Sequence, residues 1–148
     1  MTPTMKTMKM PATEPRAGTL PVRQRIARYA LWLAALGAGA SAVSSASTLW
    51  QAGSATTVVE TWRVYGYLVF AGLFALLALR PHRYRGVWEL VIANKIALTA
   101  TGLGYAVHGK IAGSGTIIVW DGGLSVVLIV AYILCRGWSR VPPVTGAA

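Results

Sequence analysis

The sequence predicts an all-α integral membrane protein, an up-down four-helix bundle with both termini in the cytoplasm. Hydrophobic residues make up 55% of the 148 residues and charged residues only 12%, well below the ~25% of soluble domains. Several apolar runs reach about 20 residues, the length that an α-helix needs to cross the hydrocarbon core. Most cations lie in the short segments between these runs, as expected for loops that orient membrane helices.

The chain has room for one domain, flanked by two tails. Residues 1–23 are rich in Thr, Pro, Met and Lys without apolar periodicity, which predicts a disordered, basic tail. The transmembrane domain is expected over 24–138 and a flexible tail over 139–148. Pro81 ends the second span, because proline cannot continue a helix, and Gly122-Gly123 is expected to interrupt the fourth. The predicted spans are 26–50, 59–79, 86–107 and 116–135.

The distribution of charge and the composition predict how the helices are oriented, which membrane holds them and which charged partners they contact. Eleven of the fourteen Lys and Arg lie in the N-terminal tail with its flank, the loop after the second span and the C-terminal tail. This bias places both termini in the cytoplasm, and the Ala-, Gly- and Arg-rich composition indicates a bacterial, multi-pass inner-membrane protein. The basic segments are expected to contact anionic lipid headgroups. A net charge of +10 without interleaved aromatic residues is not the pattern of a nucleic-acid-binding surface, so no nucleic-acid partner is expected.

The first span allows two interpretations. Small residues recur four apart, as in Gly37 with Ser41 and Ala38 with Ala42, which lets another helix approach closely. The basic start, the apolar run and the A-x-A sequences also fit a cleavable signal peptide. The apolar character continues past those sites, so we favour a retained helix.

The third span carries polar residues near its middle. A lysine such as Lys95 costs roughly 2.5–3.5 kcal/mol at the bilayer centre and rarely faces lipid. On a helical wheel, Asn94, Tyr105 and His108 share one arc and Lys95 falls in the adjoining one. We therefore expect this polar side to face the bundle interior or another subunit. Glu89 lies on the apolar side but near the end of the span, where it can reach headgroups or Arg85.

The fourth span places Asp121 and Ser125 on one helical stripe. Antiparallel packing puts Asp121 at about the level of Gly102, some two turns from Lys95, so a direct pair requires extension or a shift. Arg63, Tyr105 and His108 are predicted at depths closer to that of Asp121 and are equally good partners for it. The sequence leaves the choice open. Glu60 lies one turn before Arg63 and can pair with it.

The sequence assigns no catalytic, cofactor-binding or metal-binding residue. It lacks phosphate-binding glycine loops, metalloprotease and nucleophile-elbow motifs, and its one cysteine, Cys135, excludes an intrachain disulfide. His82 and His108 are predicted on opposite sides of the membrane, which argues against a two-histidine site. No cofactor is expected. In size and number of spans the chain resembles the DoxX-like group of small four-span proteins, a similarity that assigns no residue.

Three functional hypotheses remain. The first is association, as an accessory subunit of another membrane protein or as a homo-oligomer, with the polar centre setting the geometry of the bundle. The second is a minimal oligomeric transporter or channel for a proton, ion or small polar solute. In it Lys95 and Asp121 bind or titrate, with Asn94, Tyr105 and Ser125 as hydrogen-bond partners. The third is a membrane redox or lipid-modifying enzyme.

Overall fold

The computed structural model describes residues 21–109 and 111–138. Within them the chain forms four α-helices and no strand, and each helix is long and apolar enough to cross a membrane. The prediction of an all-α chain with four membrane-length helices is therefore confirmed, and the cytoplasmic position of both termini stays a prediction. The predicted tails lie almost wholly outside the described residues. The helices are α1 (Val22–Leu49), α2 (Thr57–Leu79), α3 (Arg85–His108) and α4 (Ser114–Cys135).

Local chemistry explains where the helices begin and end. α1 starts directly after Pro21, four residues before the predicted Ile26, because the fixed φ of proline suits a helix start. α2 stops before Arg80, whose backbone leaves the helical region ahead of Pro81. α4 begins after Gly113 at a φ of 86°, a left-handed conformation that glycine adopts without strain.

The end of α4 is closed by a left-handed cap. Arg136 has a φ of 49°, and the Gly137 N–H donates to the Tyr132 carbonyl at 2.9 Å, which is the Schellman pattern. A Cβ on Gly137 would overlap the Tyr132 ring, so only glycine fits there. Contrary to the sequence prediction, Gly122 and Gly123 do not interrupt α4, which is continuous through both.

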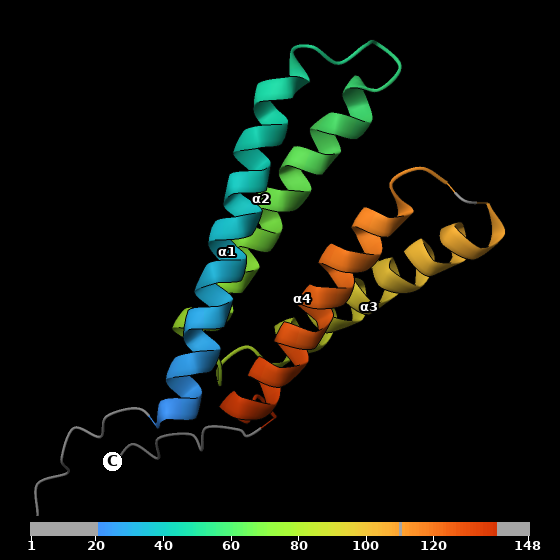
Figure 1. The fold of residues 1–148 in the computed structure, drawn as a ribbon. Helices are drawn as coiled ribbons and strands as arrows, with labels where there is room; N and C mark the ends of the chain where they lie inside the picture. The colour runs from blue at the N-terminus through green and yellow to red at the C-terminus, as the bar shows by residue number, and fades with distance from the viewer. Residues whose placement is uncertain (1–20, 110, 139–148) are drawn as a thin grey trace, which may run out of the picture.

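The helices form two hairpins that meet at one end (Figure 1). α1 packs along α2 and α3 packs along α4, whereas the hairpins contact each other mainly through α1 and α4. We call the end near Val22, Leu79 and Cys135 the closed end. The hairpins spread apart toward the opposite, open end, which carries the loops between α1 and α2 and between α3 and α4.

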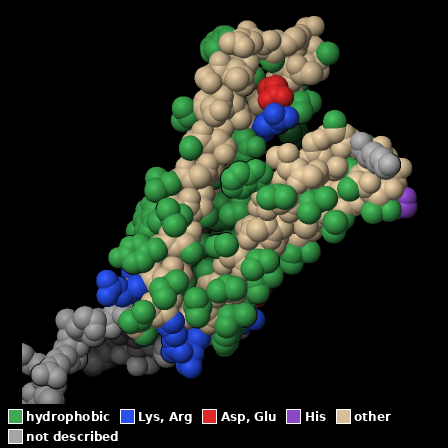
Figure 2. Space-filling model, in the orientation of Figure 1, with side chains coloured by type: hydrophobic (Ala, Val, Ile, Leu, Met, Phe, Trp, Pro, Cys, Tyr) green, Lys and Arg blue, Asp and Glu red, His purple; other side chains and the backbone are tan. Residues whose placement is uncertain are grey.

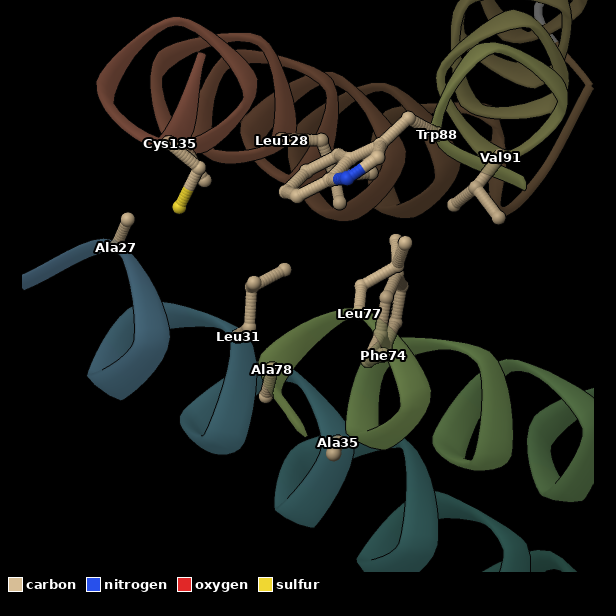
Figure 3. Packing of buried hydrophobic residues seen from close by; sticks show 11 residues of the cluster. Ala27, Leu31, Ala35, Phe74, Leu77, Ala78, Trp88, Val91, Leu128 and Cys135 are labelled. Atoms are coloured by element: carbon tan, nitrogen blue, oxygen red, sulfur yellow. The ribbon is translucent and has the colours of Figure 1, made fainter. Parts of the chain in front are cut away.

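The hydrophobic core fills the closed end (Figure 3). Trp88 and Leu128 from one hairpin face Leu31, Phe74 and Leu77 from the other, and all five are fully buried. The Trp88 indole donates a 2.8 Å hydrogen bond to the Pro81 carbonyl. This bond ties the core to the loop between α2 and α3.

Candidate functional site

An ion pair between α3 and α4 forms the polar centre of the molecule. The Lys95 Nζ lies 2.7 Å from Asp121 Oδ1, and the two side chains are 9% and 16% exposed. The ammonium also lies 4.1 Å from the centre of the Phe70 ring on α2, within the range of a cation–π interaction. Lys95, on α3, therefore contacts two other helices, α4 and α2, and joins the two hairpins.

The helix register explains how Lys95 reaches Asp121. A Cβ on Gly102 would lie 3.1–3.2 Å from Ile118 and Ile117, and one on Gly122 would lie 3.4 Å from Thr99. α3 and α4 approach closely at these two glycines. The level of Asp121 thus corresponds to about residue 100 rather than the predicted Gly102. Since only about one and a half turns then separate the pair, the lysine side chain spans the distance by extending.

The hydroxyl groups near the ion pair bond to the backbone of their own helices. Ser125 Oγ donates to the Asp121 carbonyl oxygen at 2.8 Å, and Thr99 Oγ1 donates to the Lys95 carbonyl at the same distance. Ser125 is therefore next to the centre, but its hydroxyl does not bond to the carboxylate. This arrangement leaves the ammonium and the carboxylate as each other's only charged partners among the described residues.

Asn94 and Tyr105 lie elsewhere. Both are exposed on α3, on the side of the helix that does not carry Lys95. The expectation that they face the interior of the same bundle, or bond to Lys95 and Asp121, is wrong for this chain. The helix turns about 100° per residue, so the buried arc of Lys95, Thr99 and Gly102 cannot also include Asn94. The alternative, that their arc faces another subunit, remains a prediction.

The other predicted partners pair locally or lie at a helix end. Glu60 and Arg63 form an ion pair of 3.0 Å one turn apart, and Arg85 pairs with Glu89 at 3.0 Å. Both pairs are substantially exposed, and such pairs contribute about 0–1 kcal/mol. His108 is exposed in the last turn of α3 and makes no ion pair with a described residue. None of these groups reaches Asp121.

A cleft between the hairpins borders the ion pair. Its volume is about 370 Å³, and Figure 2 shows the space opening between the hairpins, with hydrophobic side chains along it. Toward the closed end the cleft borders the hydrophobic core, and Phe74 belongs to both. The walls are mainly apolar or aromatic and include some of the small residues of α1. The lining residues are Leu33, Ala34, Gly37, Ala38, Ser41, Tyr67, Phe70, Phe74, Lys95, Thr116, Ile117, Trp120, Asp121 and Leu124.

Sequence reasoning missed the cleft and the role of Phe70. A lysine inside a span indicates that a partner exists, but the phenylalanines of this chain follow no spacing that marks one as its cation–π partner. The small residues of α1 were expected at a helix contact, and the structure divides them. Ala42 is buried, whereas Gly37 lines the cleft with open space beside its Cα.

Comparisons with protein-family models, with curated proteins and with solved structures find no match for this chain. The resemblance to the DoxX-like group therefore stays one of size and number of spans.

Proposed function

We propose that this chain is a small, multi-pass inner-membrane protein that acts by association, as a homo-oligomer joined through the outer face of α3. The observation that supports this most directly is the position of Asn94. It is the tenth of the 24 residues of α3 and is exposed, so its carboxamide projects from the middle of a helix long enough to span the membrane. It has no hydrogen bond to any described residue. An unpaired amide in hydrocarbon costs roughly 2–7 kcal/mol.

The surroundings of Asn94 form a regular stripe, which we call the α3 outer stripe. Its residues alternate spacings of four and three, and each is at least partly exposed. This is the spacing of a seam between two helices that pack side by side. The small side chains at three positions would let two backbones approach closely. The stripe consists of Leu90, Asn94, Ala97, Thr101 and Gly104.

A second copy of the chain is the partner that fits Asn94 best. Two copies inserted with the same topology can be related by a two-fold axis along the membrane normal. That axis places both Asn94 side chains at the same depth without further adjustment. A carboxamide both donates and accepts, so each Asn94 can bond to the other. A different protein would have to supply a matching polar group at that depth.

Replacing Asn94 by leucine is expected to weaken association. The substitution removes the interhelical hydrogen bonds and leaves the other positions of the stripe, so the dimer dissociation constant should rise about 3- to 30-fold, for a loss of roughly 0.6–2 kcal/mol. Energy transfer between labelled copies in liposomes measures this constant. Ile96→Leu, on a different face of α3, is the matched control and should leave it unchanged. Equal association of Asn94→Leu and the wild type would contradict the proposal.

Disulfide formation identifies the partner directly. In a Cys135→Ser background, Ala97→Cys should form a cross-linked product of twice the 15.7 kDa chain mass, whereas Ile96→Cys should not. If the outer stripe instead serves an accessory role, proteins purified from native membranes will show a cross-link of a different mass at residue 97 and no doubled chain.

A second candidate function is favoured by the cleft. Lys95 and Asp121 lie on its wall, with the apolar core of the closed end on one side and the open end on the other. A space that reaches an intramembrane ion pair from one side only is what one state of an alternating-access transporter requires. In this version the two hairpins rock about the closed end, and the ion pair binds a proton, an ion or a small polar solute.

The transport version makes a separate prediction. Asp121→Asn keeps the shape of the side chain but removes its charge, so it should abolish any pH- or ion-driven flux in proteoliposomes. Glu60→Gln, which removes a carboxylate from the exposed pair near the open end, should leave that flux intact. If the wild type carries no proton, sodium or potassium flux, transport of these ions is excluded, and if Asp121→Asn carries the same flux as the wild type, the ion pair has no part in transport.

A further inference from the structure

A second cavity lies at the closed end of the molecule and is strongly cationic. Its volume is about 290 Å³, and it is formed where the start of α1 meets the end of α2 and the loop that follows. Three arginines and one histidine line it, and no carboxylate does. Figure 2 shows Lys and Arg side chains gathered at this end of the molecule. The basic lining residues are Arg28, Arg80, His82 and Arg83.

One of these arginines is fixed in place by the fold. The Arg28 Nε donates a 2.8 Å hydrogen bond to the Ala78 carbonyl, in the last turn of α2. That carbonyl belongs to the negative end of the helix dipole, which would otherwise oppose an anion here. Arg83 lies 5.9 Å from the centre of the Tyr84 ring. Arg28 thus holds one wall of the cavity before any ligand arrives, and less entropy is lost on binding.

No described carboxylate is left to neutralise this cavity. The three acidic residues within the described ranges are each engaged elsewhere: Glu60 by Arg63, Glu89 by Arg85 and Asp121 by Lys95. Neither Arg80 nor Arg83 forms an ion pair in the described part of the chain. No carboxylate of the described residues therefore balances the charge of the cavity.

We infer that this cavity binds the phosphate of an anionic phospholipid headgroup. It lies at the ends of helices that are long enough to cross the membrane, which is the level of the headgroups. Guanidinium groups match phosphate oxygens with paired, charge-assisted hydrogen bonds. The sequence indicates only a diffuse attraction of basic segments to lipid, whereas the cavity defines one site and the side chains that would bind the phosphate there. The inference does not depend on how the chain associates.

The test uses the purified full-length protein and phosphatidylglycerol, with phosphatidylcholine as the neutral lipid. Native mass spectrometry or lipid titration in detergent measures binding. Arg80→Gln/Arg83→Gln should weaken phosphatidylglycerol binding at least about tenfold, because two charge-assisted contacts are lost. The matched control is Arg23→Gln/Arg25→Gln. It removes the same charge from the same end of the molecule, at exposed residues that do not line the cavity, and should change binding by less than about twofold.

Two further measurements complete the test. Excess inorganic phosphate should fail to displace the lipid; displacement would identify a soluble phosphate compound as the ligand of the same site. Arg80→Lys/Arg83→Lys keeps the charge but loses the paired hydrogen bonds, so its affinity should fall between those of the wild type and the glutamine variant. Equal losses in the cavity variant and its control, or equal binding of both lipids by the wild type, would overturn the inference.

Discussion

Asp121→Leu should destabilise the folded protein by about 3 kcal/mol or more, because it leaves the Lys95 ammonium without its carboxylate near the middle of the membrane. The pair is nearly buried, with Nζ and Oδ1 2.7 Å apart, and no other described carboxylate lies near enough to replace Asp121, since Glu60 and Glu89 pair elsewhere. The remaining contact with the Phe70 ring offsets only part of the loss. Unfolding in mixed micelles, followed by circular dichroism, measures the change.

The double variant Lys95→Met/Asp121→Leu separates the cost of an unpaired charge from the value of the pair. Removing both charges should restore most of the stability lost in Asp121→Leu, because apolar replacements of buried pairs are often neutral or stabilising. A double variant that is folded, associates normally and keeps every phenotype would also exclude the transport candidate. If the double variant is as unstable as Asp121→Leu alone, the account of the ion pair is incorrect.

Trp88→Ala should cost about 2–4 kcal/mol, since it opens a cavity where the two hairpins meet. The side chain is fully buried, packs 5.6 Å from the Tyr132 ring and donates to the Pro81 carbonyl. We expect a value near the lower end of the range for soluble cores, because burial from lipid lacks the hydrophobic transfer term. The same unfolding experiment measures it.

Trp62→Ala is the control for that prediction. Trp62 is 78% exposed on α2, so its removal should change stability by less than about 0.5 kcal/mol. A second effect should accompany Trp88→Ala alone. Since the core at the closed end is the main joint between the hairpins, their relative motion should increase, which spin labels on α2 and α3 can detect. Equal losses in the two variants would show that the closed end does not hold the hairpins together.

The sequence was sufficient to predict the number and type of the elements. Long apolar runs and intervening loops determine four helices, because a segment in lipid must satisfy its backbone hydrogen bonds internally. The local pairs Glu60–Arg63 and Arg85–Glu89 also follow from spacing alone. Helix formation and these ion pairs depend on residues that are close together in the sequence, so a single sequence is enough to predict them.

Features that depend on packing between helices could not be predicted from the sequence. The partner of Lys95 depends on the register of α3 against α4, which the close approaches at Gly102 and Gly122 set. Gly122 looks like a helix breaker in the sequence but acts as a contact point. Similarly, the wheel that grouped Asn94 with the interior could not say which of two adjoining polar arcs faces α4. Neighbouring residues such as Asn94 and Lys95 differ by about 100° around the helix axis, so a modest rotation of α3 determines which of the two faces α4.

Subunit counting in liposomes tests the central claim, association of two copies through the outer stripe, most directly. Single-molecule photobleaching of the labelled full-length chain should give mainly two-step traces at high protein-to-lipid ratios and a shift to single steps on dilution. For Asn94→Leu that shift should occur at a higher protein density, and for Ile96→Leu at the wild-type density. Single-step traces for the wild type at every density, or coincident dilution curves for wild type and Asn94→Leu, would contradict the account.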